Sequence, residues 1–147
     1  MRRSVLSMFS GAAALAVTTL ALAQDHPPAE ARFVPYTGVL PACGDPSVLS
    51  DIGDDFARRE SGYWASPLTI VRFLDIDETG YRSNGASYIP RRYCAARALF
   101  NDGRRRRVVY DIAEHTGFIG FSPGVTWCVV GLDRNHAFSP GCHAAGP

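Results

Sequence analysis

The chain has 147 residues and a formal net charge of +1, and all of its 15 basic residues other than histidine are arginines. This near-neutral balance argues against a nucleic-acid-binding protein, because such proteins carry an excess of positive charge for the phosphate backbone. The length suits one domain with one hydrophobic core.

The N-terminus predicts export. Arginines at positions 2 and 3 precede an apolar stretch over residues 9–23, which ends in the small-x-small pattern Ala21-Leu22-Ala23 that signal peptidase requires. The stretch is shorter than the roughly 20 apolar residues that span a bilayer, so a signal peptide over residues 1–23 is favoured over a membrane anchor. We therefore expect a periplasmic or secreted protein with no transmembrane segment after cleavage.

Four cysteines follow the predicted cleavage site, at positions 43, 94, 128 and 142. An even number of cysteines in an exported chain predicts two disulfides. A metal site is the alternative, but no pair has the C-x-x-C spacing. We predict no metal ion and no cofactor.

Residues 24–42 contain four prolines and no sustained period, which predicts an extended or disordered leader. The next residues predict a helix from Pro46 to about Glu60, ending near Gly62 and Pro67. Asp45 supplies an N-cap ahead of a proline at the first helical position. Apolar residues then recur at helical spacing, namely Val48, Leu49, Ile52 and Phe56.

From Leu68 the apolar period changes to two, which predicts strands. The expected strands are residues 68–76, 88–100, 104–113 and 125–132, with a loop over 78–87, a hairpin turn at 101–103 and a final loop over 133–147. Residues 43–147 are thus predicted to form a single α+β domain, with one N-terminal helix packed on a four-stranded antiparallel meander. This outline resembles the cystatin-like and NTF2-like folds, and such a resemblance implies no function.

The hairpin turn predicts a register in which Phe100 pairs with Arg104. Cys94 then lies beneath the helix, near Cys43 at the helix start. Strands two apart in a sheet are roughly 10 Å from each other, too far for a disulfide between Cys94 and Cys128. We therefore expect the pairs Cys43–Cys94 and Cys128–Cys142.

Seven arginines fall between Arg91 and Arg107, and the register places Arg97 directly opposite Arg107. Like charges in such a pair are unfavourable unless something compensates them. Asp75 and Asp77 on the neighbouring strand are one source of compensation. The other is an anion-binding stripe for phosphate, lipopolysaccharide or an acidic protein; its residues would be Arg91, Tyr93, Arg97, Arg105 and Arg107.

Several short patterns resemble catalytic motifs. Residues 120–124 match G-x-S-x-G, but Pro123 has no N–H for an oxyanion, so we interpret the match as a turn. The sequence Glu60-Ser61-Gly62-Tyr63 resembles the Glu-Ser motif of lytic transglycosylases over four residues. No residue is assigned a catalytic role. The histidines outside the leader, at positions 115, 136 and 143, are interpreted as surface loop residues.

Three segments resemble those of small exported bacterial proteins of unknown function: Ile89–Cys94, Tyr110–Ile112 and Trp127–Arg134. The resemblance covers about residues 43–147 and implies an envelope setting but no activity. We expect an exported, non-catalytic module that binds a protein or an anionic ligand. One alternative is a small hydrolase or lyase acting on an envelope polymer with Glu60 or Glu114. Another is a structural subunit, suggested by Trp64, Phe118 and Phe121; the oligomeric state stays open.

Overall fold

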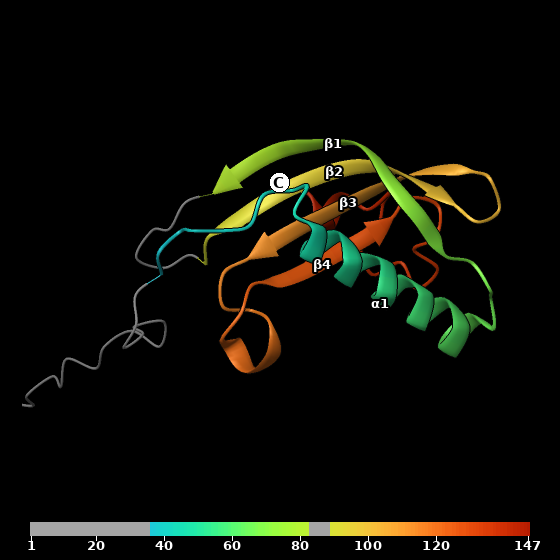
Figure 1. Ribbon diagram of the computed structural model, residues 1–147, viewed down its shortest axis with the longest axis horizontal. Helices are drawn as coiled ribbons and strands as arrows, with labels where there is room; N and C mark the ends of the chain where they lie inside the picture. Colours follow the sequence, from blue (N-terminus) through green and yellow to red (C-terminus); the bar gives the residue numbers. More distant parts are fainter. Residues whose placement is uncertain (1–35, 83–88) are drawn as a thin grey trace, which may run out of the picture. The chain divides into compact units, whose positions relative to one another are not determined.

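The computed structural model describes residues 36–82 and 89–147, so the predicted signal peptide lies outside the described residues. One helix is followed by four strands that form an antiparallel sheet in the order β1-β2-β3-β4 (Figure 1). The elements are α1 Pro46–Trp64, β1 Ile70–Arg82, β2 Arg91–Phe100, β3 Arg105–Ala113, η1 Phe118–Gly120, β4 Gly124–Val129 and η2 His143–Ala145, where η marks a 3₁₀ helix. The predicted α+β fold is confirmed.

Helix α1 begins where the sequence predicts and continues one turn further than expected. The side chain of Asp45 caps the first turn by accepting a hydrogen bond from a backbone N–H at 2.9 Å, and Pro46 follows it. The helix continues through Gly62, because a glycine costs a helix only about 1 kcal/mol and does not by itself end it. It ends at Ala65, which has a left-handed backbone with φ of 47°. The additional turn carries Trp64 to the end of the helix.

The hairpin of β2 and β3 has the predicted register. Cys94 pairs with Tyr110, and Arg97 pairs with Arg107. The predicted inner face is buried under α1, and its members are Cys94, Ala96, Ala98, Phe100, Val108, Tyr110 and Ile112. Small alanines at the centre of β2 leave room for the helix to approach the sheet.

Strand β1 is longer than predicted. The sequence predicts a strand over 68–76 followed by a loop over 78–87, but β1 stays paired with β2 up to Arg82. Register shifts occur between Leu74 and Asp77 and between Glu78 and Gly80. Each bulge places an extra residue in one strand, which breaks the period of two and makes the second half of β1 look like a loop. Residues 83–88 of the expected loop lie outside the described residues.

Strand β4 is shorter than predicted, because the chain turns after Val129. The N–H of Leu132 donates to the carbonyl of Val129 at 2.9 Å, and Gly131 has a φ of 84°. A positive φ of this size suits glycine, which has no Cβ to clash. After this turn the C-terminal segment, residues 133–147, packs back onto β3 and β4.

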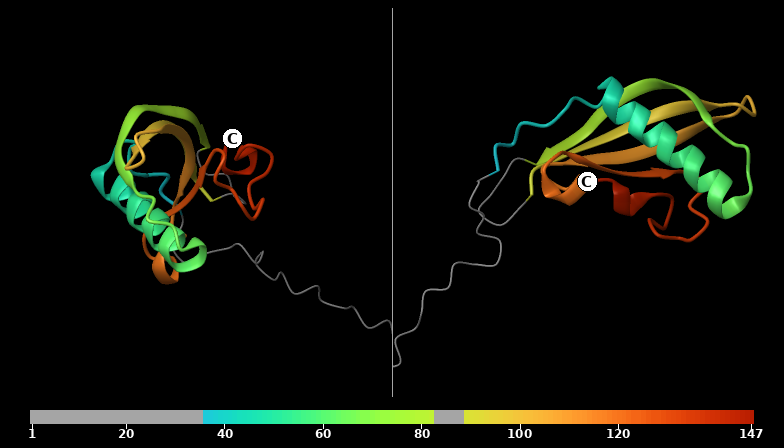
Figure 2. Two further views of the ribbon diagram at one scale, coloured as in Figure 1. Left: turned by 90° about the vertical axis from the view of Figure 1, so that its right-hand side faces the viewer. Right: turned by 60° about the horizontal axis from the view of Figure 1, so that its bottom comes forward.

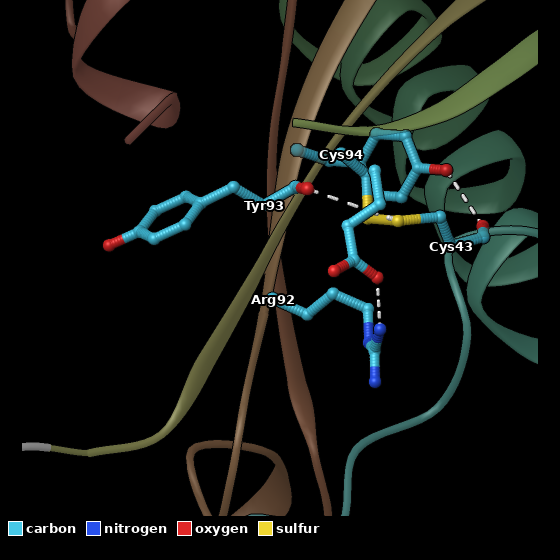
Figure 3. The surroundings of a disulfide bond; sticks show 6 residues. Cys43, Arg92, Tyr93 and Cys94 are labelled. Carbon is cyan, nitrogen blue, oxygen red and sulfur yellow. Dashed lines mark hydrogen bonds and ion pairs between the residues drawn. A yellow bond between two sulfur atoms is a disulfide. The ribbon is translucent and has the colours of Figure 1, made fainter. Parts of the chain in front are cut away.

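The core between α1 and the sheet is built around Phe56. Its ring meets Phe100 edge-to-face at 5.3 Å and Trp127 at 5.9 Å between centroids. Nearby, the Tyr110 hydroxyl donates to the Cys43 carbonyl at 2.7 Å, and burial raises the pKa of Tyr110 to about 12. This contact lies beside the Cys43–Cys94 disulfide (Figure 3).

The outer face of the sheet, which is the face away from α1, is partly covered by the C-terminal segment (Figure 2). A second small core forms there from Val109, Cys128, Cys142 and Ala145, with Val130 and Phe138 packed against it. The final loop expected from the sequence is therefore a packed layer that includes η2. The middle of the outer face is buried, and the face is open near the β2–β3 turn, where Arg105 and Arg107 are exposed.

Both expected disulfides are present. Cys43–Cys94 joins the start of α1 to β2 with a Cα–Cα distance of 5.8 Å. Cys128–Cys142 joins β4 to the C-terminal segment with a distance of 5.6 Å. Each layer that covers the sheet is thus attached to it by one covalent bond.

The described end of the leader, residues 36–42, is irregular in conformation but packed against the domain. Leu40 is buried in the main core, and Thr37 and Gly38 donate hydrogen bonds to Glu114. The prediction that the leader is disordered is therefore wrong for residues 36–42. Within the described ranges, no helix is both long and apolar enough to cross a membrane.

Candidate functional site

Arg91 is bound to a buried carboxylate. Its Nη1 donates to Oδ1 of Asp111 at 2.6 Å, and the Asp111 side chain is almost completely buried. Burial raises the pKa of Asp111, while the charge and hydrogen bond of Arg91 oppose that rise. Removing Arg91 would leave this carboxylate without its partner. Arg91 therefore does not belong with the other arginines of the predicted stripe.

Arg97, Arg105 and Arg107 line a shallow hollow of about 480 Å³ on the outer face, which we call the arginine hollow. Asp77 and Thr79 of β1 form its other side. Strands β2 and β3 position the arginines, since alternate residues of a strand point to the same face. All three arginines are exposed.

The pair Arg97 and Arg107 is only weakly compensated. Nε of Arg97 lies 4.0 Å from Oδ2 of Asp75, and both side chains are about two-thirds exposed, at 66% and 67%. Exposed ion pairs at such a distance contribute little to stability. The interpretation that aspartates of β1 neutralise this face thus explains only part of its charge.

Tyr93 is on the outer face but not in the arginine hollow. It pairs with Asp111 of β3, whereas Arg97 pairs with Arg107. Four residues along a strand correspond to roughly 13 Å. Figure 3 shows its ring and the Cys43–Cys94 disulfide on opposite sides of β2. Of the five residues proposed for the stripe, the structure brings three together.

Two further arginines of this region are paired with acids. Arg92 forms an ion pair with Glu78 (Figure 3). Arg106 and Asp102 form another at 2.6 Å, and the hydrogen bond from Arg106 lowers the pKa of Asp102 to about 2. Arg92 and Glu78 do not line the arginine hollow, whereas Arg106 does, so its pairing with Asp102 reduces the positive charge there.

A second cavity, of about 310 Å³, lies beside the last turn of α1. Its walls come from α1, β4 and the first part of the C-terminal segment. Glu60 is buried there and accepts a hydrogen bond from Nη2 of Arg134 at 2.9 Å. We call it the tryptophan cavity, because Trp64 and Trp127 both line it.

Sequence reasoning missed this cavity, although one signal pointed toward it. Glu60 continues the four-residue spacing of Val48, Ile52 and Phe56, which places its carboxylate on the buried face of the helix. The spacing therefore indicates that Glu60 needs a partner. The partner, Arg134, lies 74 positions away in the chain, and no local pattern identifies it.

Glu114, the other acid considered for catalysis, anchors the leader. Its Oε1 accepts hydrogen bonds from the N–H and hydroxyl of Thr37 at 2.8 and 2.9 Å, and its Oε2 accepts one from the N–H of Gly38 at 2.7 Å. Burial acts to raise the pKa of Glu114, but these hydrogen bonds and nearby His115 outweigh it and lower the pKa. A carboxylic acid with a lowered pKa holds no proton to donate near neutral pH.

The substitution Glu114→Gln should reduce the free energy of unfolding at pH 7 by about 1–2 kcal/mol, since an amide replaces a charged acceptor. Because the pKa of Glu114 is lowered in the folded state, the stabilisation that its carboxylate contributes is fully present above pH 4.5, the pKa of the group in the unfolded chain. This stabilisation is lost as the pH falls through the lower pKa of the folded state. Urea unfolding from pH 3 to 7 measures this. A difference between wild type and variant that stays constant over that range would contradict the assignment.

The other sequence motifs have structural explanations. The G-x-S-x-G match is a turn, as predicted: it overlaps η1 and leads directly into strand β4 rather than a helix. Nδ1 of His136 contacts the Ser139 hydroxyl at 3.1 Å, and His143 is exposed. Within residues 36–82 and 89–147, no group of three or more His, Cys, Asp or Glu residues could hold a metal ion.

Among the aromatic residues suggested for a subunit contact, Phe118 and Phe121 are about four-fifths exposed, at 85% and 80%. Trp64 is 42% exposed and belongs to the tryptophan cavity. The arginine hollow thus gathers charged groups, and the tryptophan cavity combines charged groups with aromatic ones. No family model, curated protein or solved structure matches the chain.

Proposed function

We propose that this chain is an exported, non-catalytic module of the cell envelope that binds an anionic ligand at the arginine hollow. The signal-like N-terminus and the two disulfides support an oxidising compartment. The single observation that carries the ligand proposal is the exposed pair of Arg97 and Arg107, directly opposite each other, with Arg105 beside them.

The geometry of an antiparallel pair explains why an oxyanion fits. Directly opposed residues have Cβ atoms about 5 Å apart, so two guanidinium groups can contact one phosphate or carboxylate. Each guanidinium presents two parallel N–H donors, which match the two oxygens of such a group. A bound anion would also relieve the repulsion between Arg97 and Arg107.

The enzymatic alternative has less support. A general acid or base must be free to exchange a proton with a substrate, but the carboxylate of Glu60 is already hydrogen-bonded to Arg134 at 2.9 Å. The carboxylate of Glu114 is bound to Thr37 and Gly38. Both acids therefore have structural partners. The structural-subunit alternative stays a prediction.

The double substitution Arg97→Gln and Arg107→Gln tests the proposal. Isothermal titration with inorganic pyrophosphate at low salt should show at least about a tenfold loss of affinity, because charge-assisted hydrogen bonds are lost. The matched control is Arg58→Gln with Arg72→Gln, which removes the same charge from exposed arginines outside the arginine hollow. This control should retain wild-type affinity apart from a small general charge effect.

Thermal unfolding tests whether the Arg97/Arg107 variant loses affinity only because its fold is destabilised. The Arg97/Arg107 variant should unfold at or above the wild-type temperature, because it removes a like-charge pair. Equal loss of affinity in both double variants would show that net charge alone explains the effect, and it would overturn the proposal. Wild-type affinity in the Arg97/Arg107 variant would overturn it as well.

A further inference from the structure

The tryptophan cavity has the size and composition of a small-molecule site. Its volume of about 310 Å³ lies at the lower end of the range for ligand pockets, which begins at roughly 300 Å³. The only two tryptophans of the chain, Trp64 and Trp127, both line it. Tyr63 and Phe138 add further aromatic surface. Such walls favour a ligand with a flat or apolar body.

Two guanidinium groups are stacked on these tryptophans. Cζ of Arg134 lies 4.9 Å from the ring centroid of Trp64, and Cζ of Arg59 lies 4.6 Å from that of Trp127. The contact with the ring restrains each guanidinium. Arg134 donates to Glu60, which leaves the N–H donors of Arg59 for a ligand. The cavity therefore combines aromatic surface with oriented donors.

The two acids that line the cavity, Glu60 and Asp133, are bound to groups other than Arg59. Glu60 is paired with Arg134 at 2.9 Å. Both carboxylate oxygens of Asp133 accept backbone N–H bonds, from Ala137 at 3.0 Å and Phe138 at 2.8 Å. Asp133 thus holds the loop that forms one wall. In the part of the chain that the structure describes, Arg59 has no ion-pair partner.

This loop is also covalently restrained, because Cys142 at its end is bonded to Cys128 of β4. Cys128 itself lines the cavity. The cavity is therefore formed before any ligand arrives, which lowers the entropic cost of binding.

From these observations we propose that the tryptophan cavity binds a small amphiphilic anion. Its aromatic or aliphatic body would lie against the more exposed aromatic walls, Tyr63, Trp64 and Phe138, and its carboxylate, sulfonate or phosphate would accept hydrogen bonds from Arg59. The ligand class differs from that of the arginine hollow, which lacks an aromatic wall. The two sites are independent, so the failure of one proposal leaves the other standing.

Two fluorescent probes with the same aromatic body test the proposal on the full, oxidised protein. 1-Anilinonaphthalene-8-sulfonate carries a negative charge, and N-phenyl-1-naphthylamine is neutral. The wild type should bind the sulfonate at least about tenfold more tightly, because a charge-assisted hydrogen bond is gained. Energy transfer from tryptophan should accompany binding, since both tryptophans line the cavity.

The variant Arg59→Gln should abolish the preference for the sulfonate and leave the affinity for the neutral probe unchanged within about twofold. Arg59→Lys, which keeps the charge but not the planar fork, should retain an intermediate preference. The matched control is Arg58→Gln at the neighbouring position, where the arginine is exposed and paired with Asp55. This control should behave as the wild type does.

Exposed apolar surface elsewhere also attracts such probes. The variant Phe118→Ser tests for that, because Phe118 is exposed and does not line the tryptophan cavity. Its expected affinity for both probes is that of the wild type. An undiminished sulfonate preference in Arg59→Gln would overturn the proposal, as would loss of probe binding in Phe118→Ser. Binding without tryptophan energy transfer would overturn it too. The Arg97/Arg107 double variant should bind both probes normally, which separates this site from the arginine hollow.

Discussion

Replacing Cys43 and Cys94 together by alanine is expected to lower the free energy of unfolding by about 4 kcal/mol. The disulfide joins residues 51 positions apart, so its loss releases a long loop in the unfolded chain. In the chain-entropy model the stabilisation grows with the logarithm of the loop length. Alanine is the appropriate replacement, because Cys94 is fully buried and serine would bury an unpaired hydroxyl.

The matched comparison is the double substitution Cys128→Ala and Cys142→Ala. That disulfide spans only 14 positions, and its loss should cost about 3 kcal/mol. Urea unfolding followed by circular dichroism measures both values. A larger loss for the shorter loop would contradict the entropic account and indicate that packing of the C-terminal segment dominates.

The substitution Phe56→Ala should lower the free energy of unfolding by about 4 kcal/mol, within the range for a buried phenylalanine. Phe56 is 2% exposed and meets both Phe100 and Trp127 edge-to-face. Its removal leaves a cavity at the point where α1, β2 and β4 meet. The paired strands that carry Phe100 and Trp127 restrict collapse into that space, which keeps the cost high.

Phe121→Ala is the control, because the same atoms are removed from a side chain that is 80% exposed. Its expected effect is within about 0.5 kcal/mol. Urea unfolding followed by the fluorescence of the two tryptophans measures both variants. Equal effects at the two positions would show that Phe56 is not central to the core.

The ion pair of Glu60 and Arg134 belongs both to the packing of α1 and to the wall of the tryptophan cavity. Burying an ion pair often gives less stability than packing apolar residues of the same size. Here the pair joins the end of α1 to the segment after β4, and Arg134 also stacks on Trp64. We infer that the pair shapes the wall of the tryptophan cavity.

The arrangement of α1, β2 and β3 could be predicted from the sequence because it depends on local patterns. Asp45 and Pro46 mark a helix start whatever the rest of the chain does. The turn between β2 and β3 sets a register, and the register determines which side chains share a face. The disulfide pairing followed from that register and from the spacing of strands.

The second half of β1 could not be predicted, because bulges remove the period on which strand prediction depends. The left-handed backbone at Asp75, with φ of 48°, lies within one of these irregular segments. What keeps the segment in the sheet is pairing with β2, and that pairing comes from a distant part of the chain. The local sequence therefore resembles a loop.

The sequence by itself determined the fold class, the inner face of the sheet and both disulfides. Only the tertiary structure decided which charged groups are available to a ligand. Arg91 and Arg97 look equivalent in the sequence, yet Arg91 binds the buried Asp111 while Arg97 remains exposed. Whether an arginine is neutralised depends on groups brought near it by long-range packing, and Coulomb interactions follow distance in space rather than separation along the chain.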